Sequence, residues 1–320
     1  MSVSLSSVPS SEDIFESHNL IGRYIHRTPV LTSVLLDEIA GCNLHFKCEN
    51  FQKVGAFKMR GATNAVARLS ENDLKHGVAT HSSGNHAAAL ALAARTFGTK
   101  AYIVMPSNAP KVKKNAVAGY GAEIIECEPT LAARESTLEA VVQRTKATFI
   151  HPFDNYSVIA GQATAAKELI EDIPNLDYII APVGGGGLLS GTSLSAHYFS
   201  PKTKVIAAEP EGANDAFKSF YEGKLLPSIN PKTIADGLLT SLSPKTFAII
   251  QERVSAIYTV NDEETKAAMR LVWERMKIII EPSSAVAFAV VLKNKEVFAT
   301  TNVGIIISGG NVDFDEFKFN

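Results

Sequence analysis

The apolar positions of this chain follow two alternating periods, and their succession predicts an α/β protein. From residue 77 onward, short apolar runs typical of strands are each followed by a segment with helical apolar spacing. The strands are expected at residues 78–80, 101–105 and 122–126, and the helices at residues 85–95, 109–118 and 131–147. This alternation predicts βαβ units on a parallel sheet.

The same rhythm continues toward the C-terminus and is weaker before residue 77. Later helices are expected at 158–171, 188–197, 263–276 and 283–292, and later strands at 178–183, 204–208 and 303–307. Earlier, a helix at 14–25 ended by Pro29, a strand at 43–48 and a helix at 58–69 are expected, and residues 211–231 are expected to be irregular. Two α/β lobes with a cleft between their strand ends fit this order.

Composition excludes several classes of function. The 320 residues are 46% hydrophobic and 20% charged, with a net charge of −2. This charge balance gives no sign of the basic surface with which proteins bind nucleic acids or anionic membranes. The three cysteines form no Cys-x-x-Cys pair, and no signal peptide is evident. Glu281 and Pro282 interrupt the most apolar stretch, residues 278–292. We expect a soluble, cytoplasmic protein.

Lys58 is the first candidate for chemistry. It lies between Phe57 and Met59, after a chain reversal at Gly55 and before a predicted helix. A desolvated lysine has a lowered pKa, and its neutral amine can attack a carbonyl. A surface lysine whose stem packs along Phe57 is the alternative.

Four consecutive glycines, Gly184, Gly185, Gly186 and Gly187, follow a predicted strand and open a predicted helix. Such a loop lets backbone N–H groups surround a phosphate, and the helix N-terminus adds partial positive charge. The spacing also nearly matches a dinucleotide fingerprint, with Ser190 in the last glycine position and Glu209 near the ribose-binding distance. A nicotinamide-dependent oxidoreductase therefore stays open from the glycines alone.

Three further segments carry polar groups at predicted strand ends. Residues 81–86 (His-Ser-Ser-Gly-Asn-His) can bind a carboxylate at a helix N-terminus, although Ser82 or Ser83 can equally cap that helix. Ser308 follows a buried strand and can bond a heteroaromatic nitrogen, or belong to a simple turn. Glu209 and Asp215 can hold Mg²⁺ or Ca²⁺, or form a solvated acidic loop.

Taken together, these motifs resemble the fold-type II pyridoxal-phosphate enzymes, and most closely the serine racemase and serine/threonine dehydratase family of eukaryotic type. The matching segments, in the order of the family, are residues 57–61, 82–86, 159–162, 184–187, 235–237 and 308–311. The resemblance implies a two-lobed, tryptophan synthase β-like fold with its active site in the inter-domain cleft. It implies a large cofactor-binding domain of residues 1–77 and 152–320 and a small domain of residues 78–151.

The resemblance also implies roles for individual residues. Lys58 would form the Schiff base with pyridoxal 5'-phosphate, beside Phe57. The four glycines would hold the phosphate, Asn85 would meet the ring hydroxyl and Ser308 the pyridine nitrogen. The remaining implied residues are substrate contacts at Ser82, Ser83, Asn85, His86 and Arg134, and a divalent-cation site (Mg²⁺, Ca²⁺ or Mn²⁺) at Glu209, the Ala213 carbonyl and Asp215.

Ser83 is the most informative of these positions. Lys58 works on one face of the planar cofactor–substrate adduct, and a racemase needs a second proton donor on the other face, where related threonine dehydratases carry Ala. Ser83 therefore favours racemisation, or elimination from a stereoisomer whose proton lies on that face. The sequence departs from the family pattern at two positions. Phe153 stands where vertebrate-like racemases often have Asn, which favours dehydration, and Ala163 replaces a usual Gly.

The expected activity is racemisation of serine together with its dehydration to pyruvate and ammonia. Alternatives within the family are a threo-3-hydroxyaspartate dehydratase and a threonine/serine ammonia-lyase, and a non-catalytic binding protein also stays open. A homodimer and a nucleotide effector are expected by analogy with the family. The sequence leaves the preferred substrate open.

Overall fold

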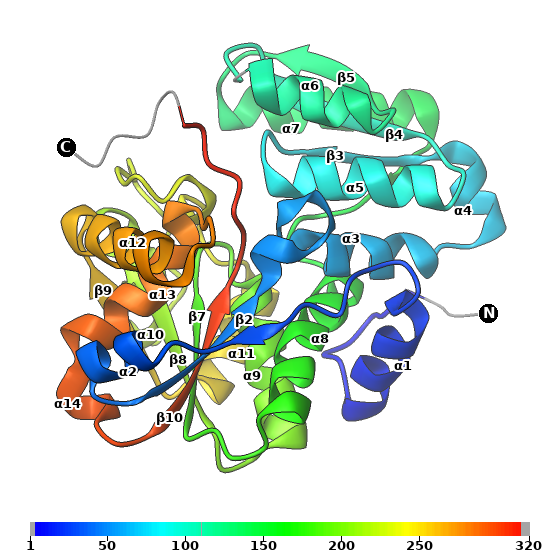
Figure 1. The fold of residues 1–320 in the computed structure, drawn as a ribbon. Coiled ribbons are helices and arrows are strands. Elements are labelled where there is room, and N and C mark those ends of the chain that lie inside the picture. Colours follow the sequence, from blue (N-terminus) through cyan, green and yellow to red (C-terminus); the bar gives the residue numbers. More distant parts are fainter. Residues whose placement is uncertain (1–3, 110, 315–320) are drawn as a thin grey trace.

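The computed structural model describes residues 4–109 and 111–314 (Figure 1). Residues 1–3, 110 and 315–320 fall within predicted domains or a predicted helix, and lie outside this described part. The strands form two separate sheets, so the predicted parallel α/β architecture is confirmed. The division of the chain into the two predicted domain ranges stays a prediction.

The larger sheet has six strands in the order β1-β2-β10-β7-β8-β9. All neighbours are parallel except β1 and β2, which are antiparallel. Its strands are β1 (Val30–Leu31), β2 (Asn43–Cys48), β7 (Tyr178–Pro182), β8 (Lys204–Pro210), β9 (Ala256–Val260) and β10 (Asn302–Ile307).

Helices cover both faces of this sheet, as the alternation along β10 shows. Val303, Ile305 and Ile307 belong to a core shared with α2 (Val34–Ala40), α12 (Asp262–Met276) and α13 (Pro282–Lys293). Ile306 points into the opposite core, which includes residues of α8 (Tyr156–Asp172), α9 (Gly187–Phe199) and α11 (Pro244–Arg253). Successive strand residues face opposite sides, so a strand buried on both sides reads as a continuous apolar run.

The smaller sheet has four parallel strands in the order β5-β4-β3-β6. Its strands are β3 (Val78–His81), β4 (Ala101–Pro106), β5 (Glu123–Cys127) and β6 (Thr148–Phe149), and the helices between them are α5 (Asn85–Thr96), α6 (Lys111–Gly119) and α7 (Leu131–Thr145). In Figure 1 this sheet and its helices lie above the larger one, with α3 (Lys58–Ala67) running between the two.

The remaining elements complete the chain. They are α1 (Ser11–Ile21), α4 (Glu71–His76), α10 (Asp215–Glu222), α14 (Lys295–Phe298) and the short helices η1 (Glu49–Phe51), η2 (Lys53–Gly55), η3 (Glu211–Ala213) and η4 (Asp236–Leu238).

Two sequence expectations were wrong. The first helix ends at Ile21, where Gly22 forms the C-cap, rather than continuing toward Pro29. The stretch expected to be irregular, residues 211–231, contains η3 and α10. The Gly, Asn and Pro residues of this stretch led to the expectation of a loop and not of α10. Phe217 and Phe220 nevertheless have helical spacing and pack against the core of the larger sheet.

No helix in residues 4–109 and 111–314 is long and apolar enough to cross a membrane.

Candidate active site

Lys58 follows a strained turn and opens α3. Val54 and Gly55 both have positive φ, at 58° and 69°. At Gly55 a Cβ would lie 2.7 Å from the Asn311 side-chain oxygen, so the turn needs glycine both for its backbone and for space. The reversal brings the chain back against the loop that follows β10.

Backbone hydrogen bonds tie the Lys58 turn to the Ser308 loop. The Phe57 N–H donates to the Ser308 carbonyl at 2.9 Å, and the Gly310 N–H donates to the Gly55 carbonyl at 2.9 Å. Ala56 and Gly309 pair between these bonds as an isolated bridge. Two motifs that are about 250 residues apart in the sequence are thereby held side by side.

The Lys58 side chain is half-buried, and its amine contacts the protein. It donates to the Pro152 carbonyl at 3.1 Å and lies 5.1 Å from the centre of the Phe57 ring. Burial lowers the pKa of Lys58 to about 8 from 10.5, against the opposing charge of Glu281. This partly desolvated setting is what a nucleophilic amine needs and favours that role over the surface-lysine alternative, although the role of Lys58 stays a prediction.

His86 lies close to Lys58 and is neutral. Its Nε2 bonds to the Ile150 carbonyl at 3.1 Å. Burial, followed by the positive charge of Lys58, lowers the pKa of His86 to about 3. Its Nδ1 has no hydrogen-bond partner in the described part of the chain.

The four glycines form a cradle that side chains would fill. A Cβ at Gly185 would lie 2.3 Å from the Phe153 ring, and a Cβ at Gly184 would lie 2.9 Å from the Leu238 Cα. Gly186 has a φ of 85°, and Gly187 starts α9 without any side chain capping the helix. A buried, uncapped helix N-terminus entered through glycines fits a phosphate group.

His151 shapes the loop that joins Lys58 to this cradle. Its Nδ1 accepts the backbone N–H groups of Phe153 at 3.3 Å and Asp154 at 2.8 Å, and its ring packs edge-on against Phe153 at 4.5 Å. Burial lowers the pKa of His151 to about 4, so this nitrogen stays free to accept. The sequence reasoning missed this role, which the spacing of His151 from Phe153 and Asp154 could have suggested.

Residues 82–84 connect β3 to α5, and Asn85 at the start of α5 faces loops of the larger sheet. The N-cap of α5 is Gly84, and no side chain caps the helix, so the expectation that Ser82 or Ser83 caps it is wrong. Residues 81–85 are half-buried. The Asn85 amide donates to the two oxygens of Glu281 at 3.1 and 3.2 Å, which joins α5 to the start of α13.

Glu281 is a site residue that the sequence reasoning missed. Only 4% of it is exposed, and its Oε2 also accepts the Asn311 N–H at 3.2 Å. Burial and the nearby charge of Asp236 raise the pKa of Glu281 to about 7. The signal was present, because a glutamate inside the most apolar stretch of the chain has to be paired or functional.

Ser308 stands at the carboxyl end of β10 and is 3% exposed. Its hydroxyl lies 2.9 Å from that of Ser284, which also accepts the Gly309 N–H at 2.7 Å. A hydroxyl held in this way can donate to a ring nitrogen, so the role of Ser308 stays a prediction, and Ser284, which the sequence did not indicate, supports the hydroxyl.

Two predicted groups, Arg134 and the pair Glu209 and Asp215, make no hydrogen bond or ion pair with Lys58 in the part of the chain that the structure describes. Arg134, on α7, is half-buried beside His81, whose pKa is lowered by burial and by the Arg134 charge. Glu209 accepts the N–H groups of Ala216 and Phe217 at 2.8 and 2.7 Å, and Asp215 lies next to it. Burial raises the pKa of Glu209 to about 8 and that of Asp215 to about 6.

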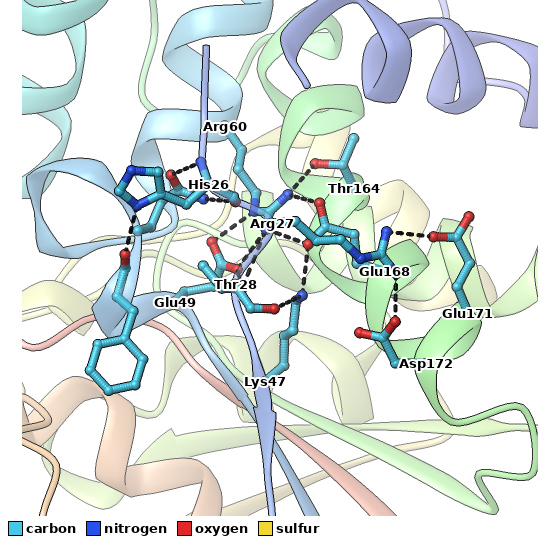
Figure 2. Close-up of polar contacts among 12 residues, drawn as sticks. His26, Arg27, Thr28, Lys47, Glu49, Arg60, Thr164, Glu168, Glu171 and Asp172 are labelled. Atoms are coloured by element: carbon cyan, nitrogen blue, oxygen red, sulfur yellow. Dashed lines mark hydrogen bonds and ion pairs between the residues drawn. The ribbon is translucent and has the colours of Figure 1, made fainter. Parts of the chain in front are cut away.

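Beneath Lys58, a buried ion-pair network anchors α3 (Figure 2). Arg60 donates to Glu49 at 2.7 Å and to Glu168 at 2.7 Å, and Lys47 donates to Glu168 at 2.6 Å. These side chains are at most 2% exposed. The network joins β2, η1 and α8 to the helix that starts at Lys58, which fixes the direction of that helix.

Comparisons with known proteins agree with this geometry. Residues 21–309 match the family described as "Pyridoxal-phosphate dependent enzyme". The serine racemase of Dictyostelium discoideum is 53% identical over 311 residues, 96% of both chains. A beta-hydroxyaspartate dehydratase of Paracoccus denitrificans is 50% identical over 98% of this chain and 99% of its own. The crystal structure of the Dictyostelium racemase has a TM-score of 0.93 and 52% identity, covering 96% of this chain and 100% of that one.

These matches confirm the resemblance and the fold class that the sequence motifs implied. They also decide between the two cofactors that the glycine loop left open, in favour of pyridoxal phosphate over a nicotinamide. Since the family match covers most of its length and relatives of 50% and 53% identity are aligned nearly end to end, the chain belongs to the pyridoxal-phosphate dependent enzymes.

Proposed function

We propose that this protein is a serine racemase that also dehydrates serine to pyruvate and ammonia. The observation that carries the proposal is the position of the Lys58 amine, bonded to the Pro152 carbonyl beside Phe153, whose ring covers Gly185. A reactive amine and a phosphate cradle are thus separated by one short loop. The similarity to the Dictyostelium serine racemase supports the choice of reaction.

The residues that would hold the cofactor come from four parts of the chain. Lys58 would bind its aldehyde with Phe57 alongside, Asn85 would meet the ring hydroxyl and Ser308 the ring nitrogen. The cradle would take the phosphate through Gly184, Gly185, Gly186 and Gly187. Bound there, the cofactor supplies an electron-withdrawing ring that makes the Cα proton of an amino acid acidic.

Lys58 and Ser83 then divide the proton transfers. The free Lys58 amine has a pKa of about 8 and is partly neutral near pH 7. When the amino group of the substrate takes its place at the aldehyde, Lys58 would be released, and its Nζ would take a proton from Cα. Ser83 Oγ would donate or accept a proton at the opposite face of Cα. Return of a proton from that face inverts the amino acid.

Dehydration starts with the same proton transfer. Once the Cα proton has gone, loss of the β-hydroxyl as water competes with reprotonation, and the product hydrolyses to pyruvate and ammonia. One site can therefore catalyse both reactions, and their ratio depends on how quickly Ser83 delivers its proton.

The substrate carboxylate would bind in the turn before α5. Ser82, Ser83 and Asn85 surround the N-terminus of that helix, which favours an anion. His86, which is neutral, would contribute a polar contact rather than a charge. Arg134 would approach only from the α7 side, beside His81.

A second candidate is a threo-3-hydroxyaspartate dehydratase, favoured by the 50% identity to the Paracoccus dehydratase. A threonine/serine ammonia-lyase is a third member of the same class. The purified enzyme should be assayed with L-serine, D-serine, L-threonine and threo-3-hydroxyaspartate, measuring keto acid and enantiomer together. Turnover of hydroxyaspartate alone would replace the racemase proposal, and no turnover of any of them would favour a binding protein.

Ser83→Ala tests the division of labour. Racemisation of L-serine should fall at least about 100-fold, because general acid–base catalysis contributes factors of this size, and dehydration of L-serine should fall far less. Lys58→Ala should abolish both reactions, and also the visible absorption band expected of a cofactor bound to this lysine. Equal losses of the two reactions in the Ser83 variant would mean that Ser83 only positions the substrate.

The loop after β8 is proposed to bind a divalent cation, Mg²⁺ or else Ca²⁺ or Mn²⁺. Glu209 and Asp215 are 1% and 5% exposed, and Asp215 Oδ2 has no hydrogen-bond partner in the described residues. Buried carboxylates without a cation partner fit such an ion. In the described ranges no group of three or more His, Cys, Asp or Glu side chains is placed to hold a metal ion. The Ala213 carbonyl and water would therefore complete the coordination of the cation. A stringent chelator should lower the melting temperature, and an unchanged melting temperature would reject the site.

The assembly and setting of the enzyme are further parts of this proposal. We expect a homodimer, a nucleotide effector and a cytoplasmic location, each supported by the family resemblance or the composition. The ranges 1–77 with 152–320 and 78–151 are proposed as the large cofactor-binding domain and the small domain. Light scattering and activity with added ATP would test the first two expectations.

A further inference from the structure

Gln162, in the middle of α8, is a fully buried amide. Its exposure is 0%, and neither its amide nitrogen nor its amide oxygen has a hydrogen-bond partner in the described part of the chain. A buried amide without partners is costly, and native proteins rarely keep one without a reason. None of the roles derived above uses this side chain.

The glycines around Gln162 show where its amide points. Its Cγ lies 3.0 Å from the place that a Cβ would take at Gly61, on α3. Its Oε1 lies 2.7 Å from the place that a Cβ would take at Gly187. The stem therefore passes α3, and the amide ends at the first residue of α9, next to the glycine cradle.

The cradle itself lacks donors other than backbone. No side chain caps the N-terminus of the 13-residue helix α9, and residues 184–190 are all buried. Bulk water therefore has little access to the N–H groups of the first turn. The two ends of a glutamine amide are interchangeable by rotation, so its NH₂ group can face the cradle. An anion here would meet backbone donors on one side and the Gln162 amide on the other.

We propose that Gln162 is a phosphate-binding residue, whose amide donates a hydrogen bond to the cofactor phosphate at the glycine cradle. The proposal rests on the placement of that phosphate at Gly184 to Gly187 made above. It explains why a polar side chain occupies the crowded space between α3, α8 and α9. It also predicts that Gln162 matters for the phosphorylated cofactor and not for its unphosphorylated form.

The test compares two ligands that differ only in the phosphate. The full-length protein, freed of cofactor, is titrated with pyridoxal 5'-phosphate and with pyridoxal, and the absorption of the lysine-bound ligand gives each Kd. The shift of melting temperature caused by inorganic phosphate is measured in parallel. The variants are Gln162→Leu, which removes the amide at similar size, and Gln162→Glu, which replaces its donor by a negative charge.

Gln162→Leu should weaken pyridoxal 5'-phosphate about 10- to 100-fold, the usual effect of a lost hydrogen bond to a charged group, and pyridoxal less than twofold. Gln162→Glu should weaken the phosphorylated ligand further. Inorganic phosphate should stabilise the wild type more than either variant. The cofactor-free Leu variant should melt no lower than the wild type, since it loses an unpaired buried amide.

Thr192→Val is the matched control. Thr192 is also fully buried with an unpaired hydroxyl in the described residues, but lies more than one helical turn beyond Gly187 on α9. The affinities of the Thr192→Val variant for pyridoxal 5'-phosphate and for pyridoxal should both stay within twofold of the wild-type values.

Two results would overturn the proposal: equal weakening of both ligands in the Gln162 variants, which indicates a packing role, or no weakening of either. If Gln162→Leu does not fold, Gln162→Glu decides by the same criterion. A wild type that binds pyridoxal as tightly as pyridoxal 5'-phosphate would instead refute the placement of the phosphate at the cradle.

Discussion

The ion-pair network beneath Lys58 gives a prediction that can be worked out from the structure. Glu168 accepts from both Lys47 and Arg60, and is 2% exposed (Figure 2). Glu168→Gln keeps the shape of this side chain and removes its charge. Lys47 and Arg60 then share a single carboxylate, that of Glu49.

The expected cost follows from the pKa of Glu168. Burial opposes its ionisation, but the hydrogen bonds and charges of Arg60 and Lys47 prevail and lower the pKa to about 2 from 4.5. This difference corresponds to ~3 kcal/mol in favour of the ionised form in the folded state. Because the folded pKa is the lower one, this stability is present above pH 4.5 and is lost as the pH falls toward 2.

Urea unfolding of wild type and variant at pH 7 and pH 3 measures this cost. At pH 7 the variant should be less stable by ~3 kcal/mol, or about 4–5 °C in melting temperature for a chain of this size. At pH 3 the difference should shrink to less than half, because protonation then reduces the advantage of the ionised carboxylate.

Glu171→Gln is the control on the same helix. Glu171 pairs with Arg27 and Lys167, but its side chain is 41% exposed, so its removal should cost less than ~1 kcal/mol. A Glu168 variant that loses no more stability than this control, or loses the same amount at both pH values, would refute the electrostatic reasoning.

Three further predictions concern the site. Gly185→Ala should reduce cofactor affinity at least about 10-fold, because the methyl collides with the Phe153 ring, and adding Phe153→Ala should recover part of it; no recovery in a cofactor titration would contradict this contact. The folded pKa of His151, about 4, lies below its ordinary 6.5, so His151 costs stability as the pH falls from 6.5 to 4, and His151→Asn should flatten the acid limb of the unfolding curve. Lys58→Met should stabilise the cofactor-free protein by up to ~3 kcal/mol at pH 7, since the lysine's folded pKa of about 8 is below 10.5, and the gain should vanish by about pH 10.5 in urea unfolding.

Much of the fold could be read from periodicity alone. The parallel strands of both sheets between β3 and β8, and the helices that join them, are close to the expected ranges, apart from the two-residue β6. Elements without a clean apolar period were missed, among them α2, α11 and β9, since contacts with the sheet rather than local pattern stabilise them.

The sequence by itself determined the groups whose chemistry is local. Lys58 in its apolar turn, the glycine loop after a strand and Ser308 after β10 are each defined by a few consecutive residues. The family was recognised from the resemblance of six such segments, in their order along the chain, to the motifs of known enzymes.

Only the tertiary structure decided which groups meet. The acceptor of Lys58 is 94 residues away at Pro152, and the acceptor of Asn85 is 196 residues away at Glu281. The same packing buried Gln162 beside Gly187, without a hydrogen-bond partner for its side chain among residues 4–109 and 111–314. Burial and pairing set the pKa of a group and its need for a ligand, and both arise only when distant segments pack together.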